Sequence, residues 1–167
     1  MKAKRIAKQR AMQESRRYRA RMQARTYLFW PISVEHEEHP ANNTEPVLSK
    51  LRQAIPRPRS FQGEGPVDVY VDLTYPFTET VPEDVRTRNF QANTIEDVCR
   101  EVRSIYEGIY AEDERLGGPV KNPNSPLINR GLGPWVWGHD IGDLVIEIID
   151  WNWVNPDHVH ADIMIGS

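Results

Sequence analysis

The residues best suited to chemistry gather in one short segment near the C-terminus. His139, Asp140 and Asp143 follow two tryptophans and a glycine, and Glu147 comes shortly after them. Imidazole and carboxylate groups are common ligands of divalent metals and common general acids and bases. One hypothesis is therefore a small metal-dependent hydrolase or nuclease that uses these four residues, with His139 and Asp140 as the catalytic candidates.

Two more histidines, His158 and His160, lie two positions apart in the last apolar segment. If residues 144–154 and 158–165 pair as a hairpin about a turn at 155–157, both rings face the same side of the sheet. The candidate metal ligands are then His139, Asp143, His158 and His160. Alternating polar residues on an open sheet face give the same pattern, and the sequence predicts no bound metal or cofactor.

A packed turn is the simpler interpretation of the same segment. In that interpretation Trp135 and Trp137 fill core space, Gly138 takes a special backbone angle, and Asp140 caps a short helix. Binding of a ligand or partner at this turn is the alternative.

The charge of the chain is segregated. Residues 1–26 hold ten basic groups and one acid, a net +9, whereas the rest holds 11 basic groups and 23 acids, a net −12. We call residues 1–26 the basic arm and predict that it contacts nucleic acid or a nucleoprotein. A solvated terminus and an organelle transit peptide are the alternatives. The basic residues of the arm are Lys2, Lys4, Arg5, Lys8, Arg10, Arg16, Arg17, Arg19, Arg21 and Arg25.

The acidic remainder predicts contacts with protein. The favoured function is a non-enzymatic binding or assembly protein with a nucleic-acid-binding arm and a protein-binding body. The two alternatives to this function are the hydrolase described above and an inhibitor whose acidic surface occupies a basic site on a host protein. No run of 18 apolar residues is present, so no membrane partner is expected and the predicted location is the cytoplasm, the host cytoplasm if the protein is viral.

A long helix over residues 94–116 is the element that must position these groups. Thr94 begins it with Asp97 in the capping-box position, and Gly117 ends it. We expect Arg103 on the outer face and Cys99 in the core rather than as a nucleophile. The apolar residues that recur with helical spacing are Ile95, Val98, Cys99, Val102, Ile105, Tyr106, Ile109 and Tyr110.

The remaining patterns predict an α+β fold. Alternation over 66–77 indicates a half-buried strand, residues 78–92 a loop, and residues 47–55 two helical turns. We expect a small three-stranded, mainly antiparallel sheet packed on the long helix. The expected divisions are the basic arm at 1–26, a Pro-rich connector with a short apolar anchor at 27–65, and the α+β domain at 66–167.

One segment resembles a group of small phage- and plasmid-encoded proteins of unassigned function. The resemblance rests on residues 133–147, GPWVWGHDIGDLVIE, on the closing Ile-Gly-Ser, on the helix ending that contains Tyr106 and Tyr110, and on Asn129-Arg130. It covers residues 94–167. It implies a viral or mobile-element origin and assigns no catalytic residue.

Overall fold

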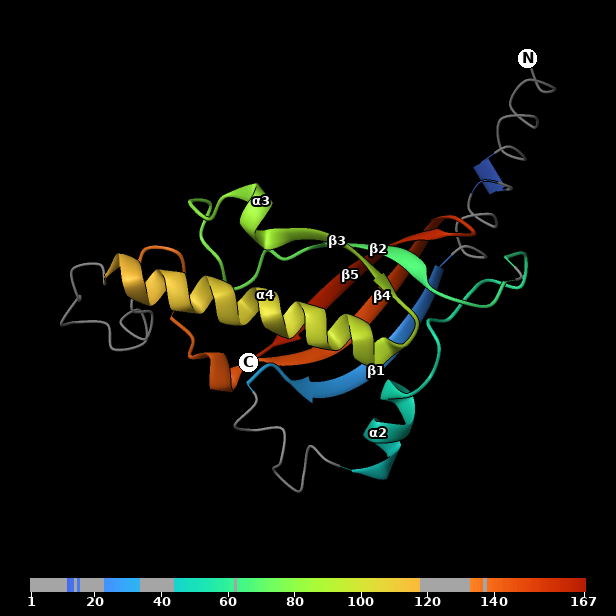
Figure 1. Ribbon diagram of the computed structural model, residues 1–167, viewed down its shortest axis with the longest axis horizontal. Helices are drawn as coiled ribbons and strands as arrows, with labels where there is room; N and C mark the ends of the chain where they lie inside the picture. The colour runs from blue at the N-terminus through green and yellow to red at the C-terminus, as the bar shows by residue number, and fades with distance from the viewer. Residues whose placement is uncertain are drawn as a thin grey trace, which may run out of the picture.

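The computed structural model describes residues 12–13, 15, 23–33, 44–61, 63–117, 133–136 and 138–167 (Figure 1). Five strands and one long helix dominate the described chain, with shorter helices between them. The elements are, in order, β1 (Gln23–Pro31), α2 (Glu45–Leu51), β2 (Val67–Asp72), α3 (Glu83–Arg86), β3 (Thr87–Ala92), α4 (Ile95–Leu116), the 3-10 helix η3 (Ile141–Asp143), β4 (Val145–Asn155) and β5 (His158–Gly166).

Helix α4 confirms the predicted long helix. Its first turn carries a capping box in which the Asp97 N–H donates to the Thr94 hydroxyl and the Thr94 N–H donates to the Asp97 carboxylate. Gly117 at its end has φ +83°, a conformation that favours glycine. The predicted apolar stripe is buried from Ile95 to Ile109.

The five strands form one mixed sheet in the order β1-β4-β5-β2-β3. Strands β4 and β5 make the predicted hairpin, whose turn holds a hydrogen bond from the Asp157 N–H to Asn155 Oδ1, 2.9 Å long. The contacts between β1 and β4 and between β2 and β3 are also antiparallel, whereas β2 and β5 run parallel. Helix α4 crosses one face of this sheet (Figure 1).

The expected three-stranded, mainly antiparallel sheet is wrong. Strand β3 lies inside the predicted loop 78–92, where Arg88, Asn89 and Gln91 have the composition of a loop. Asn89 and Gln91 nevertheless alternate with Phe90 and Ala92, as in an edge strand. Strand β1 also extends upstream of the predicted apolar anchor into the basic arm. Polar edge strands bury few side chains, so they leave only a faint hydrophobic pattern.

The two faces of the sheet differ in burial. In β2 the side chains of Val67, Val69 and Val71 are buried beneath the helix, and those of Asp68 and Asp72 are exposed on the opposite side. We call these the covered face and the open face. Strand β4 puts two tryptophans, Trp151 and Trp153, into the core on the covered side.

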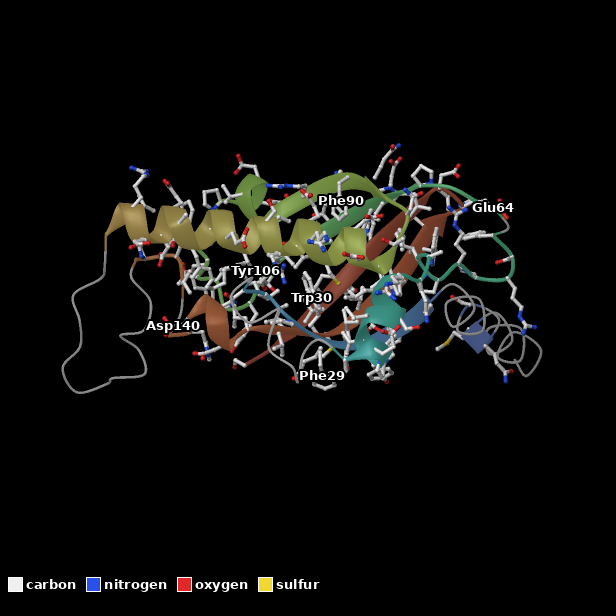
Figure 2. All side chains as sticks on the ribbon, turned by 60° about the horizontal axis from the view of Figure 1, so that its bottom comes forward. Phe29, Trp30, Glu64, Phe90, Tyr106 and Asp140 are labelled. Carbon is white, nitrogen blue, oxygen red and sulfur yellow. The ribbon has the colours of Figure 1, made fainter. Side chains whose placement is uncertain are left out.

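Arg103 is buried, so its predicted place on the outer face of the helix is wrong. Its guanidinium donates to the carbonyls of Ile32 at 2.7 Å and Pro31 at 2.9 Å, and it lies 3.8 Å from the centre of the Trp30 ring. The residue falls beside the apolar stripe, eight positions after Ile95, and its aliphatic stem follows that stripe. Arg103 therefore fastens the end of β1 to α4, and Figure 2 shows Trp30 on the α4 side of β1.

Candidate functional site

The predicted turn at His139 and Asp140 lies at one end of the molecule, beside the C-terminal half of α4 (Figure 2). His139 Nε2 is 2.9 Å from the hydroxyl of Tyr75, and the two ring centres are 5.6 Å apart. The Tyr75 hydroxyl is also 3.3 Å from Ser167 Oγ. In the described chain the partner of this imidazole is a phenol. The His–Asp pair of nucleophilic hydrolases requires a carboxylate in that place, so His139 does not form such a pair here.

Two tyrosines of α4 hold this end together. Tyr110 donates from its hydroxyl to the His139 carbonyl at 3.0 Å, and Tyr106 donates to the Tyr75 carbonyl. Burial raises the pKa of both phenols, and for Tyr110 the neighbouring carboxylates of Asp140, Asp113 and Asp143 raise it further. Both groups therefore stay protonated at neutral pH and act as hydrogen-bond donors.

A buried carboxylate fixes the segment that leads into the turn. Asp113 accepts hydrogen bonds from the backbone N–H groups of Gly133 at 2.8 Å and Trp135 at 2.6 Å. A Cβ on Gly133 would lie within 2.0 Å of the Asp113 carbonyl oxygen, so this close approach requires glycine. Trp135 is half-buried, and Trp137 lies outside the described residues.

Asp140 occupies the N-cap position of η3 but does not cap it through its side chain. No hydrogen bond joins its carboxylate to the helix, and the residue is exposed. The predicted cap is therefore wrong. The short helix is held instead by the backbone, because the Asp143 N–H donates to the Asp140 carbonyl at 3.0 Å.

The other candidate ligands lie on the sheet. His158 and His160 share the open face as predicted, with ring centres 5.1 Å apart, and Tyr70 lies 5.0 Å from His160. Glu147 lies near the opposite end of the hairpin, against Gly166. Eight residues of strand, about 26 Å, separate the positions of Glu147 and the partner of His158 on β4.

The described residues contain no group of three His, Cys, Asp or Glu side chains placed to hold one metal ion. His139 and Asp143 lie at one end of the molecule, and the two sheet histidines lie elsewhere. The hydrolase hypothesis therefore has four candidate residues but no shared centre in the described part of the chain.

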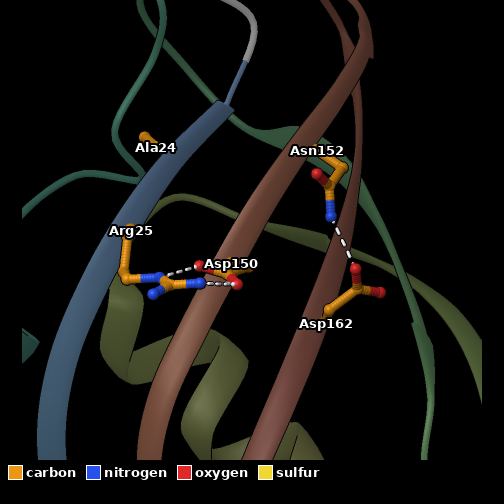
Figure 3. Close-up of a pocket in the computed structure, with 5 residues that line it drawn as sticks. All are labelled: Ala24, Arg25, Asp150, Asn152 and Asp162. Atoms are coloured by element: carbon orange, nitrogen blue, oxygen red, sulfur yellow. Dashed lines mark hydrogen bonds and ion pairs between the residues drawn. The ribbon is translucent and has the colours of Figure 1, made fainter. Parts of the chain in front are cut away.

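A shallow polar pocket lies on the open face near the start of β1 (Figure 3). The guanidinium of Arg25 makes two hydrogen bonds to the carboxylate of Asp150, 2.5 and 2.6 Å long, and these bonds raise the pKa of Arg25. Asn152 donates to Asp162 at 2.6 Å on the neighbouring strand. Arg25 joins β1 to β4 and Asn152 joins β4 to β5, so these polar groups bind one another across three strands.

Arg25 is the one predicted nucleic-acid-binding residue that the described ranges include. The positions of the other nine basic residues of the arm lie outside them. The structure therefore shows where the arm joins the body, at the beginning of β1.

An apolar row on the open face was not predicted. Tyr27, Ile148 and Met164 lie opposite one another on β1, β4 and β5, and Phe29 follows on β1 at a register shift where it has φ +99°. Tyr27, Phe29 and Met164 are 55%, 61% and 48% exposed. The alternation of Tyr27 and Phe29 with Leu28 and Trp30 was the signal that both faces of this strand carry large side chains.

Cys99 is a free and fully buried thiol in α4, as its place on the stripe predicts. Burial raises the pKa of this thiol, so it is unreactive as a nucleophile in the folded chain. None of the described helices combines the length and the apolarity that a membrane crossing requires.

Comparison of the chain with protein-family models, curated proteins and solved structures gives no match, so the site is interpreted from its own geometry.

Proposed function

We propose that this chain is a binding or assembly protein that holds nucleic acid, or a nucleoprotein, with its basic arm and contacts a protein with its acidic body. The observation that carries the proposal is the segregation of charge, +9 over residues 1–26 against −12 over the remainder. A phosphate backbone attracts the first and repels the second. We further propose action in the cytoplasm and, from the resemblance in residues 133–147, a viral or mobile-element origin.

The way the arm is attached supports separate roles for the arm, which would bind nucleic acid, and the body, which would bind protein. Strand β1 pairs with β4 along its length, and Arg103 binds the carbonyls of Pro31 and Ile32 at its end. The arm therefore continues directly into a strand that is fixed to the sheet, so a ligand bound to the arm is connected to the folded body.

The end of the molecule that carries Asp140 supports the proposed contact with a protein partner. Figure 2 shows Asp140 at the end reached by the C-terminus of α4, whereas β1 begins towards the opposite end in Figure 1. The carboxylates of Asp140 and Asp143 raise the pKa of Tyr110, and Tyr75, which contacts His139 at the same end of the molecule, is 43% exposed. Exposed carboxylates and an exposed tyrosine at one end of the molecule are suited to a partner with basic and polar side chains.

The test of the arm starts from the boundary of β1. Removing residues 1–22 leaves β1 intact, and replacing the nine basic residues upstream of Gln23 by Gln removes charge at constant length. Both variants should bind duplex DNA or RNA far less tightly. For the native chain log K should fall with log salt by about 0.9 per phosphate contact on duplex DNA, and the slope should flatten in both variants.

Fluorescence anisotropy at several salt concentrations measures these affinities. Melting temperatures equal to that of the native chain show that the body of each variant is folded. Undiminished affinity in both variants, with the same salt slope, contradicts the proposed role of the arm. If the native chain and the variant with the nine Gln replacements then capture the same protein partners equally, the acidic inhibitor is favoured over the nucleic-acid-binding protein.

A further inference from the structure

The two edges of the sheet are protected differently. On β1 the Tyr27 carbonyl accepts from Lys50 Nζ at 3.0 Å, and the carbonyl of Pro31 accepts from Arg103. Pro31 also has no N–H to offer to a further strand. Strand β3 ends the sheet on the other side, where α3 lies beside its beginning in Figure 1 and the Ile55 N–H donates to the Asn93 carbonyl just past its end.

The backbone groups that β3 directs outward follow from its pairing with β2. The Leu73 N–H donates to the Arg86 carbonyl at 3.0 Å, next to the pair Asp72 and Thr87. Hydrogen-bonded and non-bonded pairs alternate along an antiparallel ladder. The backbone groups that point away from β2 are therefore those of Thr87, Asn89 and Gln91. Because the Thr87 N–H already donates to the Glu83 carbonyl, a further strand would pair with Asn89 and Gln91.

The side chains of β3 are self-complementary about Phe90. The sequence Asn89-Phe90-Gln91 has an amide on each side of an aromatic ring, and Arg88 is followed at the other end by Ala92. In a two-fold antiparallel pairing centred on Phe90, Asn89 lies opposite Gln91 of the second copy and Arg88 lies opposite Ala92. Amides then face amides, the two Phe90 rings face each other, and no like charges meet.

We propose that β3 pairs with β3 of a second copy of this chain, so that the two sheets become one ten-stranded sheet. Arg88 does not oppose this pairing, because its guanidinium is bound to Glu101 on α4 at 2.7 Å. Half-buried Phe90 lies at this edge in Figure 2, where a second ring would cover it. The inference goes beyond the proposed function and does not depend on nucleic-acid binding.

The size of the contact sets its strength. One six-residue strand and its neighbours bury less surface than a standard permanent interface, so the dimer is expected to be weak and reversible. The two β1 strands would then lie at the outer edges of the joined sheet, at most about 43 Å apart at about 4.8 Å per strand.

Sedimentation equilibrium of the full chain over a wide concentration range tests the dimer. Asn89→Pro removes an outward N–H without removing a bond to β2, whereas Asn89→Ala keeps that N–H and serves as the matched control. The native chain and the control should dimerise alike, and the dissociation constant of the proline variant should rise at least tenfold. A native chain that stays monomeric throughout, or a folded proline variant that dimerises like the control, overturns the proposal.

A charge-pairing experiment avoids any change to the backbone. One variant carries Asn89→Lys with Gln91→Lys, and the other carries Asn89→Glu with Gln91→Glu. Each alone should be monomeric where the native chain dimerises, and an equimolar mixture should form the mixed dimer. A mixture that stays monomeric, or single variants that dimerise like the native chain, shows that the copies meet elsewhere or that this edge takes a strand from another protein.

Discussion

The covered and open faces of one sheet are built from the same strands but are held by different interactions. On the covered face, buried aliphatic and aromatic side chains meet α4, and the single buried guanidinium described there, that of Arg103, has its hydrogen bonds satisfied. On the open face, exposed side chains such as Arg25, Asp150 and Asp162 bind one another in water. The comparison teaches that stability resides on the covered side, which leaves the open side free to vary with little effect on folding.

The largest expected effect comes from placing a charge on the covered face. Ile105→Asp should unfold the chain, because an unpaired carboxylate at a 2%-exposed site costs several kcal/mol. Ser104→Asp, one position away on the exposed side of α4, should fold normally. Thermal unfolding followed by circular dichroism measures both, and equal melting temperatures would contradict the asymmetry between the two sides.

Removing the buried guanidinium should have the next largest effect. Arg103→Ala leaves two carbonyls of the chain near Pro31 without their donor and exposes the Trp30 ring to a cavity. The free energy of unfolding in urea should fall by about 2–4 kcal/mol. Arg100→Ala on the exposed side of the same helix is the control and should change it by well under 1 kcal/mol. A small effect in both would show that β1 does not need this anchor.

The capping box at the start of α4 is expected to have an intermediate effect on stability, one that depends on pH through the carboxylate of Asp97. Burial tends to raise the pKa of Asp97, but hydrogen bonds from the N–H groups of Thr94 and Asn93 outweigh it and lower the pKa below the usual 3.8. The stabilisation is therefore present above pH 3.8 and is lost as the pH falls through the folded-state pKa.

Asp97→Asn should accordingly cost about 1 kcal/mol at neutral pH, and the difference from the native chain should shrink in acid. Urea unfolding at a series of pH values from 7 downwards measures this difference. A difference that grows as the pH falls would mean that the carboxylate form does not stabilise the cap.

The smallest effect is expected on the open face. Arg25→Ala removes both hydrogen bonds to Asp150, but the side chain is 48% exposed and surface ion pairs contribute little to folding. The melting temperature should stay close to that of the native chain at low and high salt. A large decrease that disappears in salt would show that this pair, rather than the core, holds β1.

The spacing of residues in the sequence predicted the features that depend on neighbouring positions, namely the apolar stripe of the helix and the turn of the hairpin. The stripe from Ile95 to Ile109 and the turn at Asn155 and Asp157 follow from neighbours within a few positions, and both are confirmed. The pairing of Tyr75 with His139 joins residues 64 positions apart, and no spacing rule gives it.

Two further features were missed for physical reasons. Strand β3 is polar because only one of its faces and one of its edges are covered. Arg103 looked like an outer-face residue because helix rules assign charges to solvent, whereas here two backbone carbonyls and a ring replace the water.

The topology also has a consequence for the order in which the protein is made. Arg25 on β1 binds Asp150 on β4, 125 positions later in the chain. At about 5–20 residues per second, roughly 6–25 s pass between the synthesis of the two. During that interval β1 has no sheet partner, and pairings between such distant segments are slow to form. The +9 segment at residues 1–26 is therefore synthesised well before most of the acidic residues that give the remainder its −12 charge.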